Sequence, residues 1–350
     1  MTADKTAILL LNIGSPEKPK VLQVWKYLTQ FLNNKKVIDL PRVLRILLVN
    51  FIIIPSRILR STRLYKRLWI KEGSPLIYYS LEMAKKLEAS LDKNFKVFAA
   101  MRYGKPGYKK ALKKIDMGGF NNLLIIPLFP QFAMSTTGTV LEVVKNELRK
   151  RKMEIKVIIK DQFYDHPLFI KAMSAEVKKY NPPSYDHIIF SFHGLPNRHL
   201  KKCHPGISPD NCKCNQYLPE YGKYCYRATC FATSRLLAKE LKLNNTDYTV
   251  AFQSRLSKNW MSPFTDDIVI ESLKKGYKRI LIATPSFVAD CLETLIEIGE
   301  DYRKLFKESG GEELQLVTSL NFNDLWIDAL KEITYECINK YSVSQFHFKA

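Results

Sequence analysis

The stretch Ile188-Ile189-Phe190-Ser191-Phe192-His193-Gly194-Leu195-Pro196 reads as an apolar strand that ends in a histidine and then in chain-turning residues. Similar apolar runs of strand length recur at residues 7–11, 97–101, 123–127, 157–159, 187–192, 249–252, 280–283 and 314–320. Between them, apolar residues recur at helical three- and four-residue steps over residues 81–91, 139–151, 168–179, 232–241 and 292–306. Strands that alternate with helices predict parallel sheets and an α/β fold.

The distribution of these strands predicts two domains. Four of them fall on each side of residue 165, so we expect two doubly wound, Rossmann-like domains of similar plan. Residues 1–165 would form the first domain, 166–320 the second, and 321–350 a C-terminal helix and tail. The 350 residues also exceed the roughly 250 that a single core usually accommodates.

Composition excludes several classes of protein and leaves others open. Hydrophobic residues make up 46% and charged residues 25%, which argues against disordered and collagen-like chains. The net charge of +21 would attract nucleic acid, anionic lipid or an anionic substrate. The N-terminal residues do not read as an export signal, and an odd number of cysteines, seven, favours a reducing compartment. We therefore expect a cytoplasmic protein.

Residues 37–72 interrupt the alternation with an apolar and basic segment. Two apolar runs, 46–49 and 51–54, lie among Arg42, Arg45, Arg57, Arg60, Arg63 and Arg67. The runs are too short to span a bilayer, which needs about 20 residues. One interpretation is a buried helix with a solvated basic face; another is a helix lying in a membrane interface. Near a pocket, the same segment would admit a flat, apolar, anionic ligand.

Two places in the sequence combine residues suited to proton or metal chemistry. His193 ends a strand, and ligands of α/β sheets bind at such carboxyl ends. An imidazole there can act as a base or bind Fe²⁺, although a hydrogen-bonded loop histidine is an equally simple interpretation. Glu293 and Glu297 would share one helix face, where paired carboxylates can relay protons or hold a divalent cation. The alternative is a solvated acidic face.

An ordered set of motifs over residues 6–335 resembles the ferrochelatases, the enzymes that insert Fe²⁺ into a porphyrin. The set comprises Ser191-Phe192-His193-Gly194-Leu195-Pro196 and Asp290-Cys291-Leu292-Glu293-Thr294-Leu295, with residues 9–16, 72–76, 101–103, 127–132, 135–138 and 253–255, Trp260 and Thr265-Asp266. The resemblance implies two Rossmann-like domains around a porphyrin cleft, with the C-terminal helix packed on the first domain. It implies protoporphyrin IX and Fe²⁺ as substrates, at the cytoplasmic membrane surface. Coproporphyrin, or another tetrapyrrole and metal, would change the substrate and keep the fold.

The resemblance also implies roles for individual residues. His193 would be the base and metal-side residue, Glu293 its carboxylate partner, and Glu297 an extension of the proton or iron path. Candidate contacts to the macrocycle are Phe129, Trp260 and residues 46–54, with Arg102 on a propionate. Some relatives carry Tyr at the position of Phe129 and His at that of Cys291, so hydroxyl and imidazole roles are not carried over to those two positions.

Five of the seven cysteines lie between residues 203 and 230, in the spacing C-x8-C-x-C-x10-C-x4-C. A [2Fe–2S] cluster, a structural zinc or unligated thiols could each explain them. Zinc sites usually pair their cysteines as C-x₂₋₄-C, and several ferrochelatases carry [2Fe–2S] clusters, so the cluster is our prediction. Cluster-free relatives can also have a cysteine at position 230. The predicted ligands are therefore Cys203, Cys212, Cys214 and Cys225, with Cys230 spare and Cys291 and Cys337 structural.

A nucleic-acid-binding protein with a cysteine-metal module is the alternative from another class. The net charge and the cysteine-rich loop motivate it. It would need interleaved aromatic and basic residues or a known recognition module, and the sequence shows neither. We expect no nucleic-acid partner, and the sequence predicts no particular oligomeric state.

Overall fold

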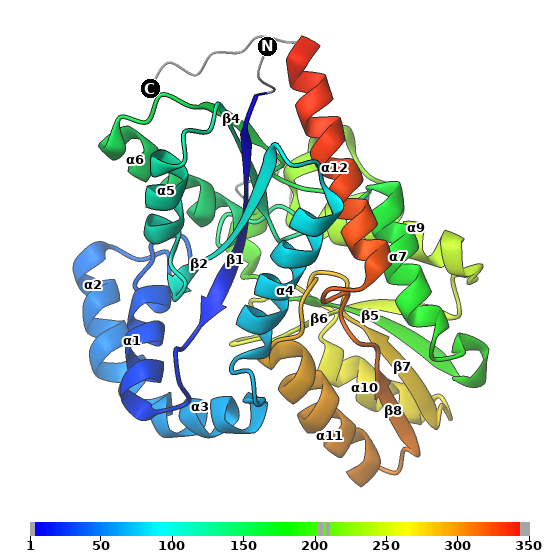
Figure 1. Cartoon of the computed structure of the whole chain (residues 1–350). Coiled ribbons are helices and arrows are strands. Elements are labelled where there is room, and N and C mark those ends of the chain that lie inside the picture. Colours follow the sequence, from blue (N-terminus) through cyan, green and yellow to red (C-terminus); the bar gives the residue numbers. More distant parts are fainter. Residues whose placement is uncertain (1–3, 202, 204–205, 208–210, 344–350) are drawn as a thin grey trace. The chain divides into compact units, whose positions relative to one another are not determined.

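The computed structural model describes residues 4–201, 203, 206–207 and 211–343. The chain divides into two compact units (Figure 1). The first comprises residues 1–129, 134–162 and 327–350, and the second comprises residues 130–133 and 163–326. Each unit is a parallel α/β structure, which confirms the fold class predicted from the alternating pattern.

The sheet of the first unit has the strand order β2-β1-β3-β4. Its strands are β1 (Thr6–Ser15), β2 (Phe95–Gly104), β3 (Asn122–Pro127) and β4 (Lys156–Ile159), and its helices include α1 (Val21–Leu32), α4 (Pro75–Ser90), α5 (Tyr108–Met117) and α6 (Thr137–Arg151). All pairings are parallel; Leu9 of β1 lies opposite Phe98 on one side and Ile125 on the other. Because helices cover the sheet, β1 is apolar on both faces and reads as a continuous hydrophobic run.

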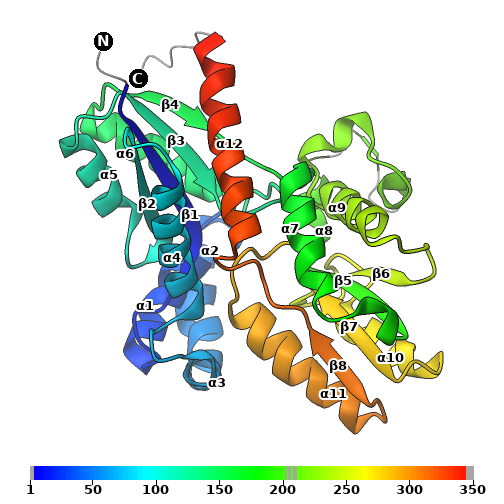
Figure 2. The same ribbon diagram turned by 45° about the vertical axis from the view of Figure 1, so that its right-hand side comes forward.

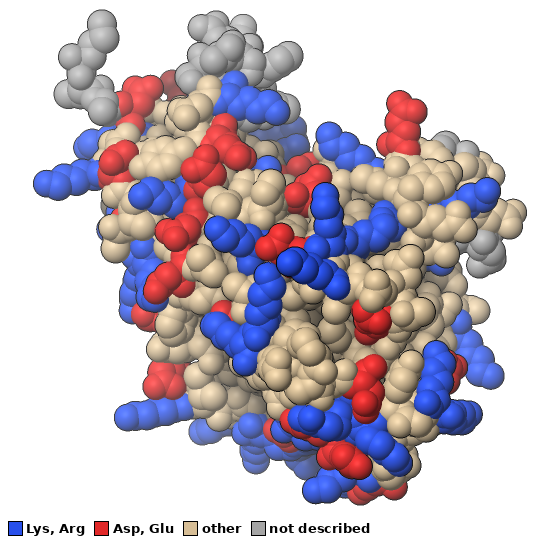
Figure 3. All heavy atoms as spheres, turned by 90° about the vertical axis from the view of Figure 1, so that its right-hand side faces the viewer, with Lys and Arg blue, Asp and Glu red and all other residues tan. Residues whose placement is uncertain are grey.

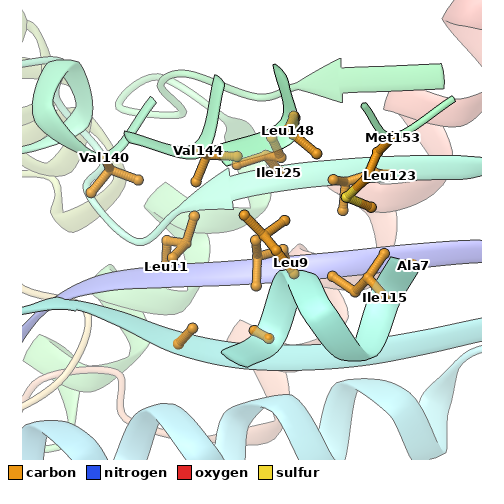
Figure 4. Close-up of a cluster of buried hydrophobic side chains, with 13 residues drawn as sticks. Ala7, Leu9, Leu11, Ile115, Leu123, Ile125, Val140, Val144, Leu148 and Met153 are labelled. Atoms are coloured by element: carbon orange, nitrogen blue, oxygen red, sulfur yellow. The ribbon is translucent and has the colours of Figure 1, made fainter. Parts of the chain in front are cut away.

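The core of the first unit lies between this sheet and two of its helices. Figure 4 shows Leu9 and Leu11 of β1 and Leu123 and Ile125 of β3 facing side chains of α5 and α6, among them Ile115, Val140, Val144 and Leu148. These residues are all at least nine-tenths buried. Burial of this apolar surface holds β1 in the middle of the sheet.

The apolar and basic segment at residues 37–72 forms a run of helices. It consists of α2 (Arg42–Leu47), a π-helix η1 (Leu48–Ile53) and α3 (Ile54–Leu68). Val49, Ile54 and Ile58 are buried and pack against Val24 and Leu32 of α1. The opposite side is exposed and apolar, with Val43, Leu44, Leu47, Phe51, Ile52 and Leu59 at 50–72% exposure.

One arginine of this segment does not belong to its basic face. Arg45 is buried, and its guanidinium donates a hydrogen bond to the Leu40 carbonyl at 2.7 Å. The segment therefore has a buried apolar face, as the first interpretation held, and in addition an exposed apolar face.

The sheet of the second unit repeats the same plan, in the order β6-β5-β7-β8. Its strands are β5 (His187–His193), β6 (Tyr248–Gln253), β7 (Arg279–Ala283) and β8 (Glu313–Leu316). The longer helices are α7 (Pro167–Lys178), α9 (Tyr226–Leu241) and α10 (Thr265–Lys274), followed by η6 (Leu292–Tyr302) and α11 (Arg303–Glu308). Side chains of α10, η6 and α11 pack on one face of the sheet, and Figure 2 shows α7 and α9 on the other side.

Two predicted elements differ from the structure. The last strand ends at Leu316 rather than at residue 320, because the chain turns away so that the Ser319 N–H can donate to the buried Asp290 carboxylate at 3.1 Å. The predicted helix at 292–306 is a π-helix up to Tyr302 and an α-helix only from Arg303. A π-helix has wider turns, which changes the residues that become neighbours.

The final helix, α12 (Asp324–Val343), packs on the first unit. The Tyr335 ring lies 5.8 Å from that of Phe95, and its hydroxyl donates to Asp92 at 2.9 Å. Among the described residues, no helix is long and apolar enough to cross a membrane.

Basic and acidic side chains share the molecular surface. Over the face shown in Figure 3, acidic side chains lie between the basic ones. Among the described residues, Arg255 forms ion pairs with Asp266 and Asp267, and Arg279 forms one with Glu313. The net positive charge is therefore partly compensated at short range.

Candidate active site

His193 lies at the carboxyl end of β5, where three loops meet. The pairing of β5 with β6 continues to His193 opposite Gln253, whereas the pairing with β7 ends at Phe190 opposite Ala283. Beyond Phe190, the loop that follows β7 lies beside β5, and its Ser286 Oγ accepts a hydrogen bond from the backbone N–H of His193 at 3.4 Å. The strand ends thus bring residues of three separate loops to one histidine.

The imidazole of His193 has a defined proton arrangement. Its Nδ1 lies 2.7 Å from the Gly194 carbonyl oxygen. A carbonyl only accepts hydrogen bonds, so Nδ1 carries a proton, and in the neutral ring the lone pair is on Nε2. The ring centroid lies 6.5 Å from that of Trp260 and 6.4 Å from that of Phe287. The imidazole therefore has a fixed tautomer when neutral and lies beside two aromatic rings.

Gly194 allows this packing. A Cβ at position 194 would lie 2.9 Å from the Gln253 carbonyl oxygen and 3.5 Å from Trp260 Cε3. The first distance is too short for a side chain, so only glycine lets the histidine loop approach β6 this closely.

Glu297 is the most strongly held carboxylate at this end of the sheet. Oε1 accepts hydrogen bonds from the Ser254 N–H at 2.7 Å and the Tyr302 hydroxyl at 3.0 Å, while Oε2 accepts from the Ser254 hydroxyl and from Gln253 Nε2. Gln253 is oriented in turn by the Ser191 hydroxyl, which donates to its Oε1 at 2.8 Å. This network fixes Glu297 in one orientation.

The electrostatics of Glu297 tie it to the other predicted residues. Burial raises the pKa of the Glu297 carboxyl above its ordinary value, and the charge of Glu293 raises it further. Hydrogen bonds from Ser254 and Tyr302 and the positive charge of a protonated His193 act in the opposite direction. The structure therefore brings His193, Glu293 and Glu297 close enough for their charges to interact.

Glu293 is held by its backbone more than by its carboxylate. Its carbonyl oxygen accepts a hydrogen bond from Gln253 Nε2 at 2.7 Å, and its side chain lies beside the Cys291 thiol. Burial, together with the Glu293 charge, raises the pKa of that thiol well above its ordinary value. Cys291 is thus a neutral, buried thiol, and Glu293 is the less constrained of the two carboxylates.

Tyr302 belongs to the site, although no sequence pattern indicated it. Tyr302 lies five residues after Glu297, and a π-helix brings residues four and five apart onto one face. No sequence signal distinguished this π-helix from an α-helix. Gln253 and Ser254 lie in one of the ferrochelatase-like motifs, but their hydrogen bonds to Glu297 could not be predicted from spacing.

The two remaining predicted contacts, Arg102 and Phe129, belong to the first unit. The guanidinium of Arg102 lies 4.4 Å above the Tyr103 ring, and its buried Nε has no hydrogen-bond partner among the described residues. Phe129 is half-buried against the core of α5 and α6. Arg102 thus retains hydrogen-bonding capacity for an anion, whereas part of the Phe129 ring serves packing.

The cysteine loop places its thiols near one another. Cys212, Cys214 and Cys225 are buried and Cys203 is half-buried. The Cys212 and Cys214 side chains are hydrogen-bonded, and Cys225 lies close enough to Cys203, Cys212 and Cys214 for their charges to interact. Burial raises the pKa of Cys214 to about 12 and that of Cys225 to about 11, so these two thiols are protonated at neutral pH when no metal is bound.

The donor set of this loop suits a thiophilic metal group by its chemistry. It consists of sulfur atoms, as iron–sulfur clusters and structural zinc sites require. In the part of the chain that the structure describes, no three histidine, cysteine or acidic side chains have the arrangement of a metal site. Metal binding would therefore have to deprotonate the thiols and draw them together.

Comparisons with known proteins identify the family. A model of the ferrochelatase family matches residues 5–337. The chain belongs to the ferrochelatase family. It is 40% identical over 342 residues to a ferrochelatase of Coxiella burnetii (strain Dugway 5J108-111), covering 97% of this chain and 95% of that protein. It is also 40% identical over 339 residues to a ferrochelatase of Legionella pneumophila (strain Paris), covering 95% and 100%.

Solved structures agree with the fold of this ferrochelatase. The sirohydrochlorin chelatase SirB from Bacillus subtilis subspecies spizizenii, in complex with cobalt, superposes with a TM-score of 0.55 at 10% sequence identity, covering 97% of each chain. SirB from Bacillus subtilis with Fe³⁺ gives the same TM-score at 12% identity, covering 99% of this chain and 100% of SirB. The family assignment makes the protein an enzyme of haem biosynthesis that inserts Fe²⁺ into a porphyrin.

Proposed function

We propose that this ferrochelatase inserts Fe²⁺ into protoporphyrin IX, and that Nε2 of His193 receives the pyrrole protons. The observation that carries this proposal is the hydrogen bond between Nδ1 and the Gly194 carbonyl, which places the proton of the neutral ring on Nδ1 and its lone pair on Nε2. Inserting one Fe²⁺ releases two pyrrole protons, so the site needs a base on the macrocycle side and a route that removes protons.

Glu297 and Glu293 would have different parts in that route. Protonation of His193 produces an imidazolium, which the Glu297 carboxylate stabilises by its charge. Because burial raises the pKa of Glu297, this carboxyl can take a proton from His193 and release it later. Glu293, which is less constrained, would be the carboxylate that meets Fe²⁺ together with His193. An incomplete set of ligands lets the metal leave for the porphyrin.

Apolar and cationic residues would select the porphyrin. Trp260 offers an aromatic face beside His193, and Arg102 would bind a propionate carboxylate through its guanidinium. Residues 46–54 add an apolar surface. Protoporphyrin IX carries two propionates and coproporphyrin carries four, so the apolar surface of residues 46–54 favours the less charged protoporphyrin.

Turnover of purified variants tests the role of His193. His193→Ala should lower kcat about 10²- to 10⁴-fold, as expected for a lost general base. His187, at the opposite end of the same strand, offers a matched control: His187→Gln should keep turnover per folded molecule. Near-normal turnover of folded His193→Ala would contradict the assignment, and faster insertion into coproporphyrin III would contradict the substrate.

We also propose that Cys203, Cys212, Cys214 and Cys225 hold a [2Fe–2S] cluster. The support is the all-sulfur donor set and the proximity of these four thiols. When bound, the cluster would supply a covalent cross-link of the loop and a redox centre. Iron and sulfide analysis with an absorption spectrum before and after dithionite tests this proposal; stoichiometric zinc without visible absorption would contradict it.

Finally, we propose peripheral binding to anionic membranes through α2, η1 and α3. The support is the exposed apolar face of this segment, with exposed arginines such as Arg42, Arg60 and Arg63 on the same run of helices. Apolar side chains would enter the interface while arginines remain among the headgroups.

A further inference from the structure

A chain of hydrogen bonds, buried at Tyr226 and partly buried at Ser286, leads from the cysteine loop to the backbone of His193. Tyr226 is the first residue of α9, directly after Cys225, and only 8% of it is exposed. Its hydroxyl is hydrogen-bonded to the Ser286 hydroxyl on one side and to the Cys230 thiol on the other. Ser286 Oγ in turn accepts the backbone N–H of His193.

The donors and acceptors of this chain run in one direction. His193 N–H donates to Ser286 Oγ, so the Ser286 hydroxyl proton is free to donate to Tyr226. The Tyr226 hydroxyl then donates to Cys230 Sγ, one helical turn further along α9. Hydrogen bonds that point the same way polarise and strengthen one another.

The sheet supports the His193 backbone on the β6 side only, where pairing continues to Gln253. On the β7 side, strand pairing stops at Phe190, three residues before His193. Beyond the end of this pairing, Ser286 in the loop after β7 accepts the hydrogen bond from the His193 N–H. On the β7 side, the backbone of His193 is therefore held by a serine whose own hydroxyl contacts Tyr226.

We propose that Tyr226 is a positioning residue that couples the cysteine loop to His193 through Ser286. The inference rests on the function proposed above, in which His193 is the base and Cys225 a metal ligand. Tyr226 follows Cys225 directly, so a metal group held by Cys225 would fix the position of the Tyr226 hydroxyl and, through Ser286, of the His193 backbone. In this arrangement the Cys230 thiol is the last hydrogen-bond acceptor, which is consistent with the proposal that Cys230 is not a cluster ligand.

Three variants and a control test this coupling. Tyr226→Phe and Ser286→Ala each remove one link, and their double variant removes the whole path. Tyr248→Phe removes a hydroxyl from the opposite end of the same sheet. The first readout is the ¹H–¹⁵N spectrum of protein labelled at its six histidines, in which His193 is assigned from the signal lost in His193→Ala. The second is steady-state insertion, with iron and sulfide content measured on the same samples.

We expect the His193 amide proton to move upfield in Tyr226→Phe and Ser286→Ala and to stay in place in Tyr248→Phe. Each of the two single variants should lose about three- to tenfold in kcat with an unchanged KM for porphyrin, which is the range expected for a lost hydrogen bond. The double variant should be no worse than the more impaired single variant, because both substitutions break one path.

An unmoved His193 amide in Tyr226→Phe, or losses in kcat that multiply in the double variant, would overturn the coupling. If Tyr226→Phe does not fold, Ser286→Ala decides the question by the same amide signal. Failure of the proposed function gives a different result: His193→Ala would then retain turnover. The amide readout does not depend on activity, so the two failures are separable.

Discussion

Replacing Phe51 and Ile52 of η1 by alanine should detach the enzyme from anionic membranes. The two side chains are 72% and 61% exposed and lie next to each other. Complete burial of such a side chain is worth about 1.5–3 kcal/mol. Scaled by the exposed fractions, insertion of both into a membrane interface stabilises binding by about 2–4 kcal/mol. The double variant should therefore bind roughly 30- to 700-fold more weakly.

Cosedimentation with vesicles of mixed phosphatidylcholine and phosphatidylserine, over a range of lipid concentrations, measures this change. Met117→Ala is a matched control, because Met117 is 78% exposed but ends α5, outside the proposed membrane-binding segment. Salt should weaken wild-type binding without abolishing it, since only the arginine contribution is screened. Equal binding of wild type and the double variant, or complete release of wild type at modest salt, would refute the role of the apolar face.

Other predictions concern the site and the cysteine loop. Glu297→Gln should slow insertion and also change the pH dependence of stability. The pKa of the Glu297 carboxyl is higher in the folded state than its ordinary value of 4.5, so above pH 4.5 the folded state keeps a proton that the unfolded chain has lost. The free energy of unfolding of the wild type therefore falls as the pH rises from 4.5 toward the pKa of the folded state. The melting temperature of Glu297→Gln minus that of wild type should therefore increase from about pH 4.5 toward neutrality, and a flat difference would contradict the reasoning. Cys214→Ser should lose iron, sulfide and visible colour, whereas Cys230→Ser should keep all three; a colourless Cys230→Ser protein would overturn the choice of ligands. With propionate binding lost, Arg102→Ala should raise the KM for porphyrin about tenfold with little change in kcat, and an unchanged KM would remove Arg102 from the binding site.

The α/β fold and the position of the central histidine were predictable from the sequence. Buried parallel strands must be apolar on both faces, so each appears as a short hydrophobic run such as residues 188–192. In the helices between them, apolar residues instead recur every three or four positions. His193 follows directly from this pattern, because the residue after a buried strand lies at the ligand-binding edge of the sheet. These features depend on residues close together in the chain.

The contacts that define the site depend on residues far apart in the chain. Ser254 reaches Glu297 across 43 positions, and Ser286 reaches the His193 N–H across 93. The sequence showed the acidic pair but not the hydrogen bonds that hold Glu297, and it placed Arg45 among exposed arginines although the fold buries it. Spacing along a helix predicts which residues share a face. Only the folded chain decides what that face meets, because burial and hydrogen bonding are set by the loops that packing brings together.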